Sequence, residues 1–175
     1  MFSDPQKNLE QFDMMPGMNV ADFGSGAGHF ALRAGQIVGP SGHVYAIDIQ
    51  KRVLVSLANE ARLSHMRHID TVWTDLEQPS SSHLRAGIID RALVVNMLFQ
   101  LREKKHLVEE VHRVLRPHGK VLVIDWHDSG KNWGPHKKSL VSEEAAQTLF
   151  EHHGFVYEKK IDAGAHHYGM IFGKV

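Results

Sequence analysis

The chain has 175 residues, of which 42% are hydrophobic and 23% are charged, and its 20 Lys and Arg balance its 20 Asp and Glu. This length favours one domain, which at such a size buries roughly 68–70% of its unfolded surface and needs no covalent cross-link. A net charge of zero argues against a general polyanion binder, and the absence of Cys excludes disulfides, thiolate nucleophiles and Cys-based metal sites.

The N-terminal residues have no basic start followed by an apolar stretch, so they do not predict a signal peptide. The most apolar run, Ala92 to Phe99, is far shorter than the ~20 residues that a membrane-spanning helix needs. We therefore expect a soluble, cytoplasmic protein.

Short apolar runs alternate along the chain with longer amphipathic ones, which is typical of strand–helix units around a parallel sheet. Strands are predicted at 19–23, 43–48, 70–74, 88–96 and 120–126, and helices after residue 28 and over 51–65, 107–115 and 142–153. Gly154 ends the last helix, and residues 155–161 and 168–174 then predict a hairpin. The sequence predicts an α/β fold of five strand–helix units followed by an antiparallel pair.

A glycine-rich loop lies where the first predicted strand ends. Asp22 precedes Gly24, Gly26 and Gly28, which form the pattern Gly-x-Gly-x-Gly. Glycine permits a tight turn and close approach of a ligand, and free N–H groups at a helix start attract negative charge. Dinucleotide enzymes need their third glycine one position later, where this chain has His29. A tight turn that binds nothing is the alternative.

Acidic residues end the next two predicted strands. Asp48 can accept hydrogen bonds from both ribose hydroxyls of an adenosyl group, in NAD or another nucleoside ligand, and its alternative role is to cap the following helix. Asp75 and Leu76 follow the third strand.

These features resemble class I S-adenosylmethionine-dependent methyltransferases, in particular the ubiquinone/menaquinone-biosynthesis-like branch. The glycine spacing, the pair Asp75–Leu76 and the segment RVLRPHGKVLVID at 113–125 match family motifs, except that His118 replaces a usual glycine. With the terminal hairpin, the resemblance covers roughly residues 9–174. It implies one methyltransferase domain over 1–175, folded as a Rossmann-like three-layer sandwich with a mostly parallel seven-stranded sheet and a C-terminal antiparallel hairpin.

The resemblance implies S-adenosyl-L-methionine as cofactor and methyl donor. Asp22 would lie near its amino-acid part, Asp48 on the ribose, Asp75 and Leu76 on the adenine, and Asn96 near the methionine end. The expected cofactor-binding set is Asp22, Gly24, Ser25, Gly26, Gly28, Asp48, Asp75, Leu76 and Asn96.

The methyl acceptor is expected at the carboxyl ends of the fourth and fifth strands. The residues expected on the acceptor side are Met97, Trp126, Trp133 and His136. His127 is the candidate catalytic base because imidazole titrates near neutral pH, and Asp125 is a second catalytic candidate. An exposed loop histidine and a structural acid are the respective alternatives.

Two segments complete the expected acceptor side. Residues 127–141 form a polar connection long enough to suggest a function, and residues 1–15 form a lid, a membrane-surface contact or, as we favour, core packing. Lys131, Trp133, Lys137 and Lys138 suit a polyanionic acceptor, but zero net charge argues against nucleic acid, so we expect a small molecule.

The 14 His residues include the adjacent pairs 152–153 and 166–167. Neighbouring residues point in different directions on a strand or a helix, so such pairs rarely chelate one ion. We expect no metal and solvent-facing histidines. The sequence thus predicts in-line methyl transfer to a small-molecule acceptor, and it leaves a non-catalytic S-adenosylmethionine-binding subunit and an NAD-dependent oxidoreductase open as alternatives.

Overall fold

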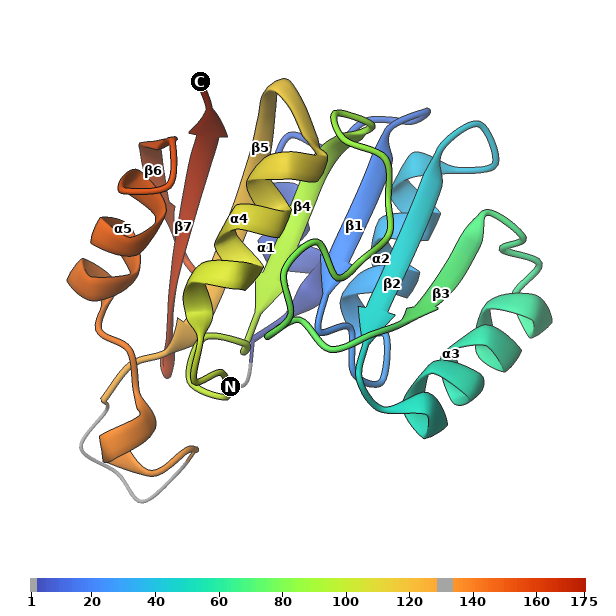
Figure 1. Ribbon diagram of the computed structural model, residues 1–175. Coiled ribbons are helices and arrows are strands. Elements are labelled where there is room, and N and C mark those ends of the chain that lie inside the picture. Colours follow the sequence, from blue (N-terminus) through green and yellow to red (C-terminus); the bar gives the residue numbers. More distant parts are fainter. Residues whose placement is uncertain (1–2, 129–133) are drawn as a thin grey trace.

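The computed structural model describes residues 3–128 and 134–175, so Lys131 and Trp133 of the predicted acceptor loop lie outside the described residues. The strands are β1 (Asn19–Phe23), β2 (His43–Asp48), β3 (Ile69–Trp73), β4 (Ile89–Val95), β5 (Leu115–Trp126), β6 (Phe155–Ile161) and β7 (His167–Lys174). They form a seven-stranded sheet in the order β3-β2-β1-β4-β5-β7-β6, parallel from β3 to β5 and antiparallel at β7 and β6 (Figure 1). This confirms the predicted fold class.

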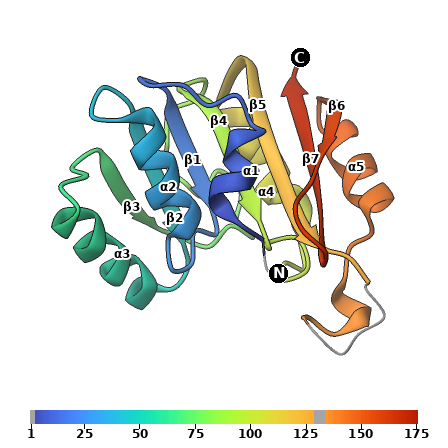
Figure 2. The same ribbon diagram turned by 180° about the vertical axis from the view of Figure 1, so that it is seen from behind.

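Helices cover both faces of the sheet. They are α1 (Pro5–Glu10), α2 (His29–Val38), α3 (Lys51–Leu63), α4 (Lys104–Val114) and α5 (Glu143–Glu151), with a 3-10 turn η1 (Lys137–Ser139). The first three lie on one face (Figure 2), where Ala31 and Leu57 belong to one hydrophobic cluster. Helices α4 and α5 lie on the other face, where Val111 and Phe150 belong to a second cluster. The sheet therefore separates two cores.

The connection between β3 and β4 differs from the prediction. Residues 74–88 contain no helix, so the chain has four strand–helix units and not five. Pro79 lacks an N–H to donate, and Ser80 and His83 have positive φ angles of 51° and 58°, which a right-handed helix does not allow. The predicted bounds of β1, β2 and β6 are confirmed, and those of β3, β4 and β7 shift by one residue. Strand β5 begins at Leu115, five positions before the predicted start at Lys120.

A buried carboxylate fastens this connection to α4. Glu110 is only 1% exposed, and its Oε1 accepts hydrogen bonds from the Ser82 N–H at 3.0 Å and from the Ser82 hydroxyl. Arg113 donates to both oxygens of the same carboxylate, at 2.8 and 2.7 Å. The connection that begins with Asp75 is thereby held against the helix layer without a helix of its own.

The N-terminal segment contributes to the core beside α2. Leu9 and Phe12 are 2% and 0% exposed and belong to the same cluster as Ala31. Met15 is 61% exposed. Core packing thus accounts for the two most buried apolar side chains of this segment.

The chain reverses its winding between β1 and β4, because β1 pairs in parallel with both β2 and β4. In such open sheets, ligands bind outside the carboxyl ends of the strands at the point of reversal. The fold therefore places the glycine loop, which follows β1, beside the residues that follow β4.

We expect Glu110→Ala to lower the free energy of unfolding by about 2–4 kcal/mol, because Arg113 and the buried Ser82 groups lose their shared partner. Urea unfolding would measure this loss. Glu109, the exposed neighbour in α4, is the matched control, and Glu109→Ala should change the free energy by less than about 0.5 kcal/mol. Equal losses in the two variants would contradict the fastening role of Glu110.

Candidate methyl-donor site

The glycine loop is fixed by left-handed backbone conformations. Gly24, Gly26 and Gly28 have φ angles of +81°, +51° and +86°, which side-chain-bearing residues rarely adopt. A Cβ on Gly28 would lie 2.2 Å from Leu57 Cδ1, so Gly28 is needed where α2 meets α3. A Cβ on Gly26 would meet nothing within 4 Å, so Gly26 borders open space.

The N–H groups of this loop are already used within the protein. Gly24 and Ser25 both donate to the Ile47 carbonyl, at 2.8 and 2.9 Å, and Gly26 donates to Asp48 Oδ2 at 2.9 Å. Gly28 donates to the Ser25 carbonyl at 2.8 Å. The loop is therefore bound to the end of β2. The sequence predicts free N–H groups that attract an anion, but these four N–H groups are already bonded within the protein. This favours a ligand without a phosphate at the loop.

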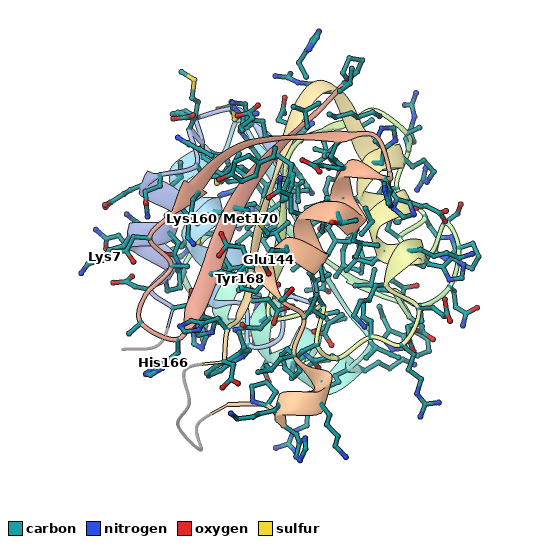
Figure 3. All side chains as sticks on the ribbon, turned by 90° about the vertical axis from the view of Figure 1, so that its left-hand side faces the viewer. Lys7, Glu144, Lys160, His166, Tyr168 and Met170 are labelled. Atoms are coloured by element: carbon teal, nitrogen blue, oxygen red, sulfur yellow. The ribbon has the colours of Figure 1, made fainter. Side chains whose placement is uncertain are left out.

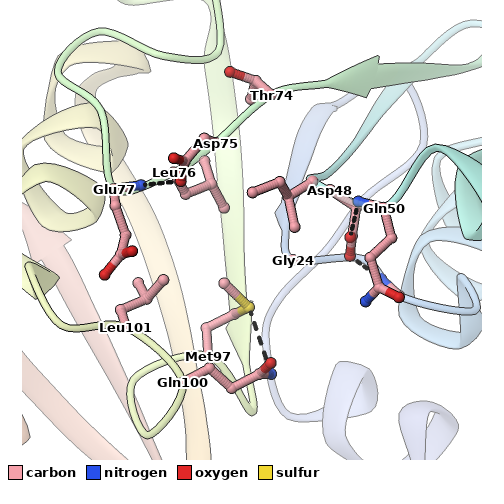
Figure 4. A pocket seen from close by; sticks show the side chains of 12 residues that line it. Gly24, Asp48, Gln50, Thr74, Asp75, Leu76, Glu77, Met97, Gln100 and Leu101 are labelled. Atoms are coloured by element: carbon pink, nitrogen blue, oxygen red, sulfur yellow. Dashed lines mark hydrogen bonds between the residues drawn. The ribbon is translucent and has the colours of Figure 1, made fainter.

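A first cleft of about 250 Å³ opens beside the loop (Figure 4). Asp48 lies in its wall, 7% exposed, with Oδ2 on the Gly26 N–H and Oδ1 on the Gln50 N–H at 2.8 Å. Each carboxylate oxygen has a second lone pair, so an oriented Asp48 can also accept hydrogen bonds from ligand hydroxyls. The lining residues are Gly24, Gly26, Asp48, Ile49, Gln50, Thr74, Asp75, Leu76, Glu77, Met97, Gln100 and Leu101.

Asp75 and Leu76 form the other side of this cleft. Asp75 Oδ1 accepts from the Glu77 N–H at 2.9 Å, and Leu76 is 4% exposed. Met97, for which the sequence predicts a place on the acceptor side, reaches into this cleft (Figure 4). Its Sδ would lie 1.9 Å from a Cβ on Gly24, so Met97 covers that glycine directly.

A second cleft of about 290 Å³ adjoins the first and shares Gly24, Gly26 and Gln100 with it. Its remaining lining residues are Ser3, Asp22, Ser25, His29, Phe30, Val95, Asn96, Trp126 and His167. Five buried polar atoms among them have no hydrogen-bond partner: Asp22 Oδ2, Ser25 Oγ, Asn96 Oδ1, and Nδ1 and Nε2 of His167. Buried polar groups are normally paired, so this concentration marks a place for a polar ligand.

Asp22 is the most strongly perturbed acid of this cleft. It is 1% exposed, and burial together with repulsion from Asp48 raises its pKa to about 7. A hydrogen bond from the Ala31 backbone acts in the opposite direction and lowers the pKa. A cationic ligand group beside Asp22 would favour its charged form. The residue therefore suits an ammonium or sulfonium ion.

Asn96 faces the same cleft from the end of β4. Its φ angle is +56°, its N–H donates to the Ile124 carbonyl at 2.8 Å, and its carbonyl accepts from Gln100 Nε2 at 2.6 Å. The backbone is thus held on both sides, while the side-chain Oδ1 stays unpaired.

The two predicted catalytic residues lie outside the lining of both clefts. His127 is exposed, with Nε2 3.2 Å from the Ala165 carbonyl. Asp125 is fully buried, accepts from the N–H groups of Leu98 and Trp126 at 2.7 and 2.8 Å, and has its pKa raised by burial to about 6. Asp125 therefore fastens the end of β5 to the residues that follow Asn96. Their catalytic roles stay predictions.

Of the other residues expected on the acceptor side, Trp126 lines the second cleft, whereas His136 is exposed and accepts from the Lys138 N–H at 3.2 Å.

In the described residues, 3–128 and 134–175, no group of three His, Asp or Glu is placed to hold a metal ion. Within the same ranges, every helix is too short or too polar to cross a membrane.

His167 lines the second cleft although no sequence motif singles it out. We expected the pair 166–167 to face solvent, but His167 is 6% exposed and its ring lies 4.3 Å from that of Trp126. The position follows from the register of β5 and β7, which pairs Trp126 with His167. The predicted hairpin was the available signal, but it did not fix which residue would lie opposite Trp126.

Comparison with known proteins decides the family. The family described as a methyltransferase domain matches residues 15–168 of this chain. The chain belongs to that family. Ubiquinone/menaquinone biosynthesis C-methyltransferase UbiE of Bordetella parapertussis is 31% identical over 69% of this chain and 45% of its own length. An arsenite methyltransferase of Halobacterium salinarum is 29% identical over 64% of this chain and 28% of its own length.

The fold is shared as well. A SAM-dependent methyltransferase from Aquifex aeolicus superposes with a TM-score of 0.90 and 25% identity, over 99% of this chain and 91% of that one. The chain spans less than half the length of the two curated relatives just named. None of these three proteins is described as an NAD-dependent oxidoreductase or a non-catalytic subunit, so the comparisons do not support those alternatives.

Family and fold imply S-adenosylmethionine as the cofactor, and the residues of the two clefts fit it. The open space at Gly26 and the oriented Asp48 suit an adenosyl group, with Leu76 as an apolar surface for the base. The unpaired atoms of Asp22, Ser25 and Asn96 suit the charged methionine end.

Gly26→Ala tests this fit. We expect the variant to lose about 1 kcal/mol of stability from the left-handed backbone, and its affinity for S-adenosylhomocysteine to fall about tenfold or more because the Cβ enters the ligand space. Titration calorimetry and urea unfolding would measure the two effects. Gly87 has a φ angle of +70° and also faces open space. It precedes β4 and so lies at the amino end of that strand, away from the glycine loop, which makes Gly87→Ala the matched control. Equal affinity losses in both variants would refute the placement.

Proposed function

We propose that this chain transfers the methyl group of S-adenosylmethionine to a small, uncharged acceptor by in-line displacement. The joined clefts carry the proposal: the first fits an adenosyl group, and the second begins at the same glycines and contains the unpaired polar atoms. The methyl donor and an acceptor can therefore meet beside Gly24 and Gly26.

The bound cofactor supplies an activated methyl group, so the chain needs no covalent nucleophile. Asp48 and Leu76 hold the adenosyl part, and Asp22 and Asn96 orient the charged end. Trp126 forms a wall that excludes water from the acceptor side. Proximity and orientation of this kind contribute up to ~7–11 kcal/mol in favourable cases.

The lining residues of both clefts narrow the acceptor class. No Lys or Arg occurs among the described residues that line them, so neither cleft offers a cation to a phosphate or carboxylate. Lys137 and Lys138 lie on the 134–141 segment and do not line either cleft. This supports an uncharged acceptor over the polyanionic one.

The names of the relatives point to two acceptor types, quinone precursors and arsenite. Arsenite is a soft acceptor that thiolates bind well, and this chain contains no Cys. We therefore propose an organic acceptor, such as a ring compound of the quinone-precursor class.

Two segments are proposed to close over the acceptor. Ser3 lines the second cleft, which supports a lid role for the part of residues 1–15 that precedes α1, whereas Leu9 and Phe12 are held in the core. Residues 127–141 follow Trp126 directly. Protection of the N-terminal segment from limited proteolysis on addition of donor would support closure. The single-domain boundary, the cytoplasmic location and the base role of His127 stay predictions.

Titration with S-adenosylmethionine and with NAD, followed by measurement of S-adenosylhomocysteine release over a panel of uncharged ring acceptors, tests the function. Binding of the donor with release of product would support it. Preference for NAD would overturn the cofactor assignment, and donor binding without release on any acceptor would favour a non-catalytic subunit.

Asp22→Asn yields a pH test. Folding raises the pKa of Asp22 to about 7, so ionisation destabilises the free protein, and its stability should fall as pH rises from about 4 to 7. The variant should lack this part of the pH dependence in thermal unfolding. Donor affinity of the unmodified protein should rise up to about tenfold between pH 6 and 8, as Asp22 becomes charged, and stay flat in the variant.

Asp162→Asn is the control for this pair of measurements, because Asp162 is exposed and lies in the loop after β6. It should retain both pH profiles. A variant Asp22→Asn that keeps the pH profile of the unmodified protein would show that another group titrates.

A further inference from the structure

His167 occupies a position that joins the hairpin to the acceptor side. It is the first residue of β7 and lies opposite Trp126 of β5 in the antiparallel register. It lines the second cleft together with Trp126 and Asn96. The following strand residues Tyr168 and Met170 and the preceding His166 are visible along the hairpin, with His166 at its lower end (Figure 3).

The ring of His167 makes no polar contact within the described protein. Both Nδ1 and Nε2 are buried and without a hydrogen-bond partner, although a neutral imidazole carries one donor and one acceptor. A phenylalanine ring would pack against Trp126 without this cost. An unpaired buried group in a cleft wall is best explained by a partner that arrives with a ligand.

The charge state of His167 limits what it can do. Burial, together with His166 and His127 nearby, lowers its pKa to about 4. The imidazole is therefore neutral near pH 7 and a weak base, so it is suited to hydrogen bonding and not to proton removal.

The remaining walls indicate the shape of the partner. Four rings line the second cleft, those of the exposed His29 and of Phe30, Trp126 and His167. Gly134 is packed against the indole, because a Cβ there would lie 2.6 Å from Trp126 Cε3. The Trp126–His167 side of the cleft is therefore flat and aromatic, and the two buried, unpaired nitrogens of His167 lie in it.

We propose that His167 is an acceptor-binding residue that orients the methyl acceptor through a hydrogen bond, and that the acceptor is an uncharged ring compound with a hydroxyl group. This inference rests on the proposed function, since it assigns the Trp126–His167 side of the second cleft to the acceptor and leaves the side of Asp22, Ser25 and Asn96 to the donor. It adds a residue that the sequence motifs do not include.

Thermal unfolding of His167→Phe distinguishes this role from a structural one. The variant should unfold at the same temperature as the unmodified protein or higher, because it removes an unpaired buried polar group and keeps the ring contact with Trp126. His152, exposed at the end of α5, is the matched control, and His152→Phe should leave the temperature unchanged. A drop of several degrees confined to His167→Phe would show a structural role and overturn the proposal.

Binding of 2-naphthol, an uncharged ring with one hydroxyl, tests the ligand. By calorimetry, with and without S-adenosylhomocysteine, His167→Phe should bind 2-naphthol about five- to tenfold more weakly than the unmodified protein and bind S-adenosylhomocysteine within about twofold. His152→Phe should match the unmodified protein, and naphthalene-2-sulfonate should bind more weakly than 2-naphthol.

Equal 2-naphthol affinity in His167→Phe, preference for the sulfonate or no binding of 2-naphthol to the unmodified protein would each overturn the inference. The proposed function fails separately. If S-adenosylhomocysteine does not bind while 2-naphthol binds in a His167-dependent manner, the role of His167 in ligand binding stands and the methyl transfer does not.

Discussion

The candidate site depends on the contact between the glycine loop and the end of β2. Gly24 and Ser25 donate to the Ile47 carbonyl, and Gly26 donates to the Asp48 carboxylate. These bonds require left-handed backbone at Gly24 and Gly26, which explains why glycine stands there. They also orient Asp48 at the mouth of the first cleft. Because these three N–H groups are bonded within the protein, this part of the loop presents the Asp48 carboxylate to the cleft and does not present free N–H groups.

The same arrangement places two carboxylates, Asp22 and Asp48, close together, which is electrostatically unfavourable. Asp22 and Asp48 lie close enough to raise the pKa of Asp22, and Asp22 is buried with one oxygen unpaired. Replacing Asp22 with an apolar residue would relieve the repulsion, but it would also remove the group that suits a cation. Functional sites often retain such locally unfavourable groups, and stability is then supplied elsewhere, here by two hydrophobic cores and by the Glu110 contact.

Features that depend on local sequence were predictable. The glycine loop, Asp48 and Asp75 each follow a recognisable strand, and parallel strands bring their carboxyl ends to one edge of the sheet, so these residues could be placed together from sequence. The helix-free connection after β3 could not be predicted in this way. It is held by a contact between Ser82 and Glu110, which are 28 residues apart, so no local sequence pattern indicates it. The bounds of β3, β4 and β7 differ from the prediction by one residue, because the hydrogen bonds that define a strand end depend on its neighbours in the sheet.

The residues of the proposed acceptor side were even harder to predict from the sequence. The sequence favours His127 as the base because imidazole titrates near neutral pH, yet His127 is exposed. The imidazole with both nitrogens buried and unpaired belongs to His167, forty residues later. Only the register of an antiparallel pair places that residue opposite Trp126, and shifting the register by one residue would send the side chain to the other face of the sheet. The candidate donor side is thus built from parallel strand ends, whereas the proposed acceptor side is built from the pairing of β5 with β7. A change in that hairpin can alter the Trp126–His167 wall of the second cleft without changing Asp48 or the glycine loop, because these residues belong to different parts of the sheet.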